Sequence, residues 1–168
     1  MKMTDMARAG GVQGGHLPLL AGEAHALWRF LTTRYLYLEL TQLLINYVKD
    51  TEFKTAVLRG VSTTMDRQIK KTEELMEAYG VSLPPKPPKS VRATAKSETI
   101  RDELIYRLLL TGIQYFQEMH SETLRMMNND QMRNIFMGWM DEEMKIYDQM
   151  VKYGKVKGWY WNAPQYKQ

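Results

Sequence analysis

The sequence of 168 residues contains no cysteine. Without thiols the chain can form no disulfide, offers no thiolate to a metal ion and has no cysteine nucleophile for catalysis. Disulfides are rare inside cells, so their absence here fits an intracellular origin. We therefore expect a cytoplasmic protein.

Long apolar runs are also missing, since none approaches the 18 residues that suggest a membrane-spanning helix. The N-terminus has no uninterrupted apolar segment of the kind found in signal peptides. Residues 1–20 contain four glycines, but His16-Leu17-Pro18 follows them where a phosphate-binding loop would need Lys-Ser/Thr. We interpret residues 1–20 as a flexible leader and expect no membrane partner.

The net charge of +4 does not indicate a nucleic-acid partner. The excess of basic residues is local: it gathers at 86–101 and near the C-terminus at 152–167. Elsewhere both signs are interspersed, as on an ordinary solvated surface. We expect no nucleic acid to bind.

Strand-like alternation is scarce, and helical spacing predicts four helices at 23–49, 51–79, 97–127 and 130–154. Asp50, Ser97 and Asp130 are the expected N-caps, and Gly80 and Gly154 the expected stops. In the first helix the apolar residues recur at helical spacing. They are Ala24, Leu27, Trp28, Leu31, Tyr35, Leu38, Ile45 and Val48. In the third, the expected inward residues are Leu104, Leu108, Tyr115, Met119 and Thr123. Such stripes need partner helices, so the fold class is an all-α four-helix bundle.

Four of the six prolines lie in a linker at 81–96. Its 16 residues reach roughly 50 Å in polyproline conformation, whereas a helix of about 28 residues is about 42 Å long. The linker can therefore run the length of the bundle. The resulting order is up-down-down-up with one long crossover between the second and third helices, which is the ferritin-like arrangement. An up-down-up-down bundle is the alternative. Residues 21–168 then form a single domain, with an aromatic tail at 155–168 that we expect to pack over the bundle end.

A ferritin-like bundle raises the hypothesis of a metal site. Di-iron members use Glu-x-x-His on two of their helices, and no histidine of this chain has a glutamate three residues before it. The nearest candidate metal ligands are Glu39, Glu143 and His120, which could hold iron or manganese. Glu143 falls on the apolar stripe of the fourth helix, so burial would require a partner such as His120, Gln68 or Tyr35. An ordinary internal polar network is the favoured interpretation, and our expectation is no cofactor.

No catalytic arrangement is visible either. The serines lack a strand-turn-helix context, and two carboxylates on separate helices are common in bundles. We expect no enzyme activity. Eight of the thirteen methionines lie at 119–150. Methionine fills irregular cores, but it also forms adaptable partner surfaces.

Four stretches of the sequence resemble a known family: Glu23-Ala24-His25-Ala26-Leu27-Trp28, the turn 47–54, Gly80-Val81-Ser82-Leu83-Pro84, and Gly158-Trp159 with Pro164 and Tyr166. They look like ferritin-like proteins of unknown function from spore-forming bacilli, related to spore coat protein F. The resemblance implies a four-helix bundle, no established activity, and a role as a coat or spore-associated component. It further implies a homo-oligomer or another coat protein as partner. Family members often carry a histidine where this sequence has Gln68, and this departure weakens an inherited metal site.

Overall fold

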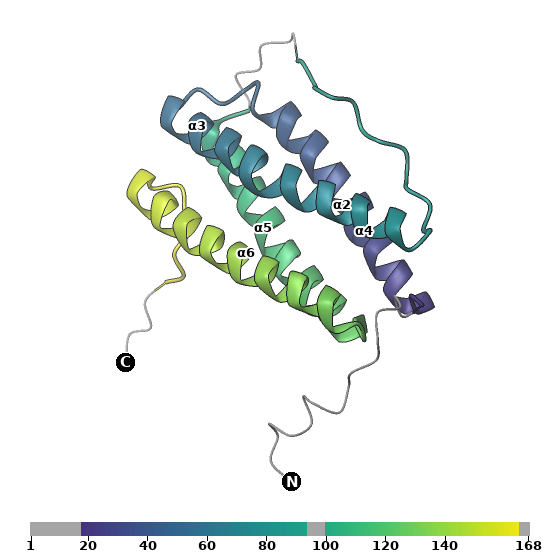
Figure 1. Ribbon diagram of the computed structural model, residues 1–168. Coiled ribbons are helices and arrows are strands. Elements are labelled where there is room, and N and C mark those ends of the chain that lie inside the picture. The colour runs from purple at the N-terminus through teal and green to yellow at the C-terminus, as the bar shows by residue number, and fades with distance from the viewer. Residues whose placement is uncertain (1–17, 94–99, 165–168) are drawn as a thin grey trace, which may run out of the picture.

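The structure is a computed structural model that describes residues 18–93 and 100–164. Most of the predicted leader, the linker residues 94–96, Ser97 and the end of the tail lie outside these ranges. The described residues form four helical rods and no strand, as Figure 1 shows. The rods are α2 (Ala21–Leu44), a continuous rod of α3 (Thr51–Gly60), the π-helix η1 (Val61–Met65) and α4 (Asp66–Ala78), then α5 (Asp102–Met126) and α6 (Asp130–Lys157). The prediction of an all-helical bundle is confirmed.

The first helix ends at Leu44 and not at Lys49 as predicted. Asn46 lies in the turn after it, and its side-chain amide donates to the carbonyls of Gln42 (2.7 Å) and Leu43 (3.1 Å). The bond to Gln42 satisfies a carbonyl in the last helical turn, and the Leu43 carbonyl also accepts from the Asn46 backbone N–H at 3.3 Å. Val48 beyond the turn is still buried, because the chain bends back onto the core.

The second rod begins and ends where local signals predicted. The Asp50 side chain accepts from the Phe53 backbone N–H at 2.9 Å, so Asp50 is the N-cap. Gly80 has φ +68°, and the Val81 N–H donates to the Met76 carbonyl at 2.8 Å, which is a Schellman ending. The π-helical turn η1 in the middle was not predicted.

Two predictions about α6 are wrong. Its N-cap is Asn129 and not Asp130: the Asn129 Oδ1 accepts from the Met132 N–H at 3.1 Å. The helix also continues past Gly154 to Lys157 and ends at Gly158, which has φ +72°. Gly154 has a different role, because a Cβ there would lie 1.9 Å from the Tyr106 hydroxyl oxygen. Glycine at 154 lets α5 approach α6 closely.

The predicted inward face of α5 is confirmed at Met119 and Thr123, which are buried, and is wrong near the start of the helix. Leu104 and Leu108, expected in the core, are 42% and 43% exposed, whereas Ile105 and Tyr106 are fully buried. Trp28 on α2 is likewise 45% exposed. Around Trp28 the predicted stripe is otherwise correct, since Leu27, Leu31 and Leu38 are buried.

The described part of the proline-rich linker, 81–93, follows α2 lengthwise. Lys86 pairs with Glu73 near the end of α4 (2.8 Å), and Asn46 at the far end of α2 donates to the Val91 carbonyl (3.0 Å). The chain therefore returns to the end where α3 began before α5 starts, and α4 and α5 run in the same direction (Figure 1).

Each end of the bundle is held by a carboxylate that reaches across to the other helical hairpin. Glu23 in the first turn of α2 accepts from the backbone N–H groups of Asn128 and Asn129, both at 2.8 Å. At the opposite end Asp102, the first residue of α5, accepts from those of Lys49 (2.9 Å) and Asp50 (2.7 Å). In both cases the second donor is the N-cap residue of a helix. We call Glu23 and Asp102 the end clasps.

The core consists of two apolar clusters. The larger surrounds Phe30, where Trp139 stacks at 5.5 Å between ring centroids. The smaller surrounds Phe53 and contains Trp159 of the tail at 5.4 Å, so the expected packing of the tail over the bundle end is found for Trp159. Trp161 remains 76% exposed. No helix within 18–93 or 100–164 is long and apolar enough to cross a membrane.

Candidate functional site

A buried polar cluster lies at the centre of the bundle, and each of the four rods contributes one side chain to it. The members are Arg34 of α2, Gln68 of α4, His120 of α5 and Glu143 of α6, each at most 3% exposed. Every one of them stands on the inner stripe of its helix, among apolar neighbours. The sequence thus places four polar groups where the packing of the helices must bring them together.

Arg34 is the hub of this central cluster. Its Nη2 donates to Glu143 Oε2 and to Gln68 Oε1, both at 2.6 Å. The flat guanidinium lies over the Phe116 ring, with Cζ 3.5 Å from the ring centroid. The ion pair, the amide and the aromatic face together replace the water that a buried cation loses.

The electrostatics of the cluster follow from burial and pairing. Burial raises the pKa of Glu143, but the contacts with His120 and Arg34 outweigh it, so the pKa lies below its ordinary value. Burial lowers the pKa of His120, and its Nε2 lies 3.6 Å from Glu143 Oε2, which is too long for a hydrogen bond. At neutral pH the cluster therefore holds one cation, one carboxylate and a neutral imidazole.

A second ion pair connects the cluster to the surface. Gln68 Nε2 donates to Glu142 Oε2 at 3.2 Å, and Arg67 Nη2 donates to Glu142 Oε1 at 2.6 Å. Arg67 is half exposed. Glu142 therefore links the buried amide of Gln68 to solvent along the α4–α6 boundary.

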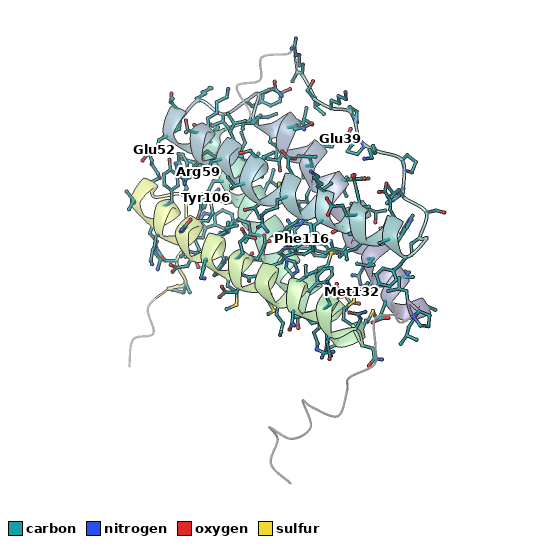
Figure 2. The ribbon with its side chains drawn as sticks, viewed as in Figure 1. Glu39, Glu52, Arg59, Tyr106, Phe116 and Met132 are labelled. Carbon is teal, nitrogen blue, oxygen red and sulfur yellow. The ribbon has the colours of Figure 1, made fainter. Side chains whose placement is uncertain are left out.

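The structure brings together only part of the predicted candidate site. Glu143 and His120 are neighbours and Gln68 lies beside them, but Glu39 is exposed on α2, at the edge of the bundle (Figure 2). Tyr35, expected as a partner of Glu143, instead donates its hydroxyl to Glu73. The helices therefore do not bring Glu39 into one candidate metal site with Glu143 and His120.

Arg34 was missed by the sequence reasoning, although a signal was present. It falls three residues after Leu31 and four before Leu38, two positions of the apolar stripe. A charged residue in such a position requires a buried partner of opposite charge. Glu143, already placed on the stripe of α6, was the acid available to serve as that partner.

The cluster does not fit the metal site that the bundle suggests. Among the residues that the structure describes, no three His, Asp or Glu side chains are grouped to hold an ion. The donor set is also chemically unsuited, because the Arg34 guanidinium already supplies the positive charge beside Glu143 at 2.6 Å. A divalent cation would have to compete with this guanidinium for the same carboxylate.

A cleft of about 1010 Å³ reaches the cluster from outside. It lies between the α3–η1 half of the second rod and the facing parts of α5 and α6, and both Arg34 and Glu143 line it. In Figure 2, Glu52 and Arg59 stand on α3 and Phe116 lies between the helices, and all three line this cleft. The buried ion pair is thus the floor of an accessible hollow.

Fold and site together define a class, the helical-bundle proteins with a buried polar cluster at the centre. The model of the family described as "Protein of unknown function (DUF3231)" matches residues 9–168. The chain belongs to this family.

The structure is similar to a crystal structure from Bacillus halodurans C-125 described as a "putative spore coat protein". The TM-score is 0.82 at 23% sequence identity, over 90% of this chain and 98% of the other. At that identity the likeness establishes a shared fold. No curated protein matches the chain.

Proposed function

We propose that this protein is a non-enzymatic structural or interaction protein associated with the spore coat. The observation that carries the proposal is the likeness to the Bacillus halodurans protein, which extends over 90% of this chain and 98% of that one. Membership of a family matched from residue 9 to residue 168 is compatible with it. The proposed partner is a second copy of this chain or another coat protein.

Exposed leucines on two packed helices support an interaction surface. On α2, Leu36 and Leu43 are 62% and 38% exposed and stand seven residues apart; on α5, Leu104 and Leu108 stand four apart. Each spacing places its pair on one face of its helix. Apolar side chains that repeat along a helix face are typical of surfaces that bind a partner.

Sedimentation of the purified protein over a range of concentrations tests self-association. We expect the wild type to form oligomers and the double variant Leu104→Glu/Leu108→Glu to form fewer, because charges on this face must be desolvated on contact. Leu58→Glu is the matched control, since Leu58 is a 51% exposed leucine on α3.

Detection in the coat fraction of spores from the source organism tests localisation. Presence in washed spores, released only by extraction of the coat, is the expected result. A protein that stays monomeric at all concentrations and is absent from the coat fraction contradicts the proposal.

The finer classification of the bundle as ferritin-like, up-down-down-up, is also proposed. The lengthwise course of residues 81–93 and the common direction of α4 and α5 support it. The alternative function is that of a ferritin-like metal-binding protein, and its remaining candidate ligands are His120 and Glu143. Elemental analysis after incubation with iron or manganese decides it: bound metal in proportion to protein, lost in Glu143→Gln, would favour the alternative.

A further inference from the structure

The cleft has the composition of a small-molecule site. Its walls are mainly apolar, with α3 and η1 on one side and α5 and α6 on the other. The apolar side chains that line it include Phe53, Val57, Val61, Ile113, Phe116 and Ile146. A volume of about 1010 Å³ is at the upper end of the range for such pockets, which run from about 300 to 1,000 Å³. Polar side chains also line it, and among them the buried pair Arg34 and Glu143 lies at the floor, where it can orient a ligand.

The floor holds one hydrogen-bond donor without an acceptor among the described residues, the Nε–H of Arg34. Both hydrogen bonds of Arg34 to other side chains use Nη2. The Nε of this 2% exposed side chain has no partner among the described residues. A buried donor without a partner destabilises a protein by about 1 to 3 kcal/mol and needs an explanation. An oxygen acceptor at the inner end of the cleft supplies one.

The π-helical turn is an independent observation at the same place. Val61, Thr63, Thr64 and Met65 of η1 all line the cleft. Single π-helical turns within α-helices are rare and often mark functional sites, because they realign the side chains on one face. Here the turn faces the hollow that ends at Arg34.

The charges of the cleft select the kind of ligand. Its four charged lining residues are two arginines, Arg34 and Arg59, and two glutamates, Glu52 and Glu143. They cancel, and the buried pair already cancels by itself at 2.6 Å. A carboxylate ligand near Arg34 would face Glu143, whereas a neutral oxygen would not be repelled.

We propose that the cleft between α3–η1 and α5–α6 binds an uncharged, elongated apolar molecule whose terminal oxygen accepts a hydrogen bond from the unpartnered Nε–H of Arg34. The apolar body lies along Val57, Val61 and Ile113. This binding activity does not depend on the coat-associated role.

A matched series of probes tests the chemistry on the wild-type chain. Nile red, a neutral apolar dye with a carbonyl group, is bound first and then displaced by octan-1-ol, octane or octanoate. We expect octan-1-ol to bind about tenfold more tightly than octane, because only the alcohol can accept from a charged donor. Octanoate should bind no more tightly than the alcohol, because of Glu143.

Two neighbouring residues of α3 locate the site. Val57 lines the cleft and is partly buried, whereas Leu58 is 51% exposed and is not among the lining residues. Val57→Trp should fill the hollow and weaken octan-1-ol binding by at least about tenfold, and Leu58→Trp should leave it unchanged. If Val57→Trp does not fold, Ile113→Trp on the opposite wall makes the same comparison, with Met126→Trp as control because Met126 is exposed on α5 and does not line the cleft.

The remaining outcomes overturn the proposal in whole or in part. Failure of the wild type to bind dye and alcohol removes it, as does unchanged binding in Val57→Trp and Ile113→Trp. Equal affinity for octane and octan-1-ol would show that Arg34 donates no hydrogen bond to the ligand. Tighter binding of octanoate than of octan-1-ol would show that the cleft prefers an anionic ligand to an uncharged one. A third outcome combines two results: the wild type forms a dimer and binds no dye, and Val57→Trp sediments as a monomer. This outcome would show that a second copy of the chain occupies the cleft.

Discussion

At the scale of single residues, the molecule depends on a cation placed in its core. Arg34 is 2% exposed and has Glu143 as its only carboxylate partner within 2.6 Å among the described residues. Removing one member of a buried pair leaves the other charge unpaired, whereas removing both need not destabilise the fold. We therefore expect the ion pair to contribute more to the choice of packing than to net stability.

Arg34→Met tests this view. We expect a loss of about 3 to 5 kcal/mol in the free energy of unfolding at pH 7, measured by urea denaturation, because Glu143 stays buried without its partner. The double variant Arg34→Met/Glu143→Met should regain most of it. Arg59→Met on the exposed side of α3 is the control and should change stability by less than about 0.5 kcal/mol. A single variant as stable as this control would contradict the interpretation.

His120 makes the stability of the core depend on pH. Both of its ring nitrogens lack a hydrogen-bond partner among the described residues, and burial lowers its pKa. The unfolded chain then binds a proton at a higher pH than the folded one, so stability falls as pH drops below about 6.5.

His120→Phe should remove this loss between pH 7 and pH 5. Phenylalanine suits the site, because the imidazole already packs against Phe30 at 5.2 Å and Phe136 at 6.1 Å between ring centroids. Thermal unfolding at several pH values measures the effect, with the exposed His25→Phe as control. An unchanged pH profile in His120→Phe would show that another group titrates.

At the scale of elements, the hairpins are joined by their ends as well as by their faces. Glu23 connects α2 to the α5–α6 turn, and Asp102 connects α5 to the α2–α3 turn. The two contacts are reciprocal, each satisfying backbone donors next to an N-cap. Asp102 thereby holds the first turn of α5 against the α2–α3 turn.

Glu23→Gln should destabilise the protein by about 1 to 3 kcal/mol, because three backbone donors lose a charged acceptor. Burial raises the pKa of Glu23, but the N–H groups of Leu20, Asn129 and Asn128 outweigh it and hold the pKa below its ordinary value. The stabilisation is therefore present above the unfolded pKa and lost as the pH falls through the lower folded value.

The variant should accordingly lose less stability than the wild type when the pH falls from 5 to 3. Acid titration followed by circular dichroism measures this difference. Glu39→Gln, which alters an exposed residue of the same helix, should follow the wild-type curve. Identical acid-titration curves for Glu23→Gln and the wild type would show that the Glu23 carboxylate does not stabilise the fold in this way.

Two glycines of α6 give a matched comparison of packing. A Cβ at Gly154 would overlap the Tyr106 side chain, whereas nothing lies within 4 Å of one at Gly138. Gly154→Ala should destabilise by about 1 to 3 kcal/mol through overpacking, and Gly138→Ala should stabilise by roughly 0.5 to 1 kcal/mol through the unfolded chain. Urea denaturation of both variants checks the opposite signs, and equal effects would contradict them.

At the scale of the whole molecule, stability is unevenly distributed along the second rod. The ten residues of α3 bury one side chain, Phe53, whereas α4 buries five. The cleft lies against α3 and η1, so this half of the rod has fewer neighbours to hold it. Local opening should require less free energy there than in α4.

Hydrogen exchange measures this difference. We expect amides of residues 54–65 to exchange at least about tenfold faster than those of residues 68–76, because fewer buried contacts oppose opening. Octan-1-ol should slow exchange at 54–65 if it occupies the cleft. Uniform protection along the rod would show that α3 is as firmly packed as α4.

The sequence by itself determined the helical class, the number of rods and several of their ends. Helical spacing, the Asp50 cap and the stop at Gly80 act within a few residues, so they can be recognised without the fold. Glu143 was placed on the apolar stripe of its helix for the same reason, and this side chain is buried. Leu104, Leu108 and Trp28 were expected in the core but are exposed, although most other members of the same stripes are buried.

Only the tertiary structure decided what these helices build. Arg34 and Glu143 are 109 residues apart in the chain. Gly154 was predicted to end its helix, but its role is to make room for the Tyr106 side chain of α5. The π-turn and the cleft likewise depend on how separate helices pack. Local signals act on the backbone of one segment, whereas pairing, close approach and hollows arise between segments, and no short stretch of sequence contains both partners.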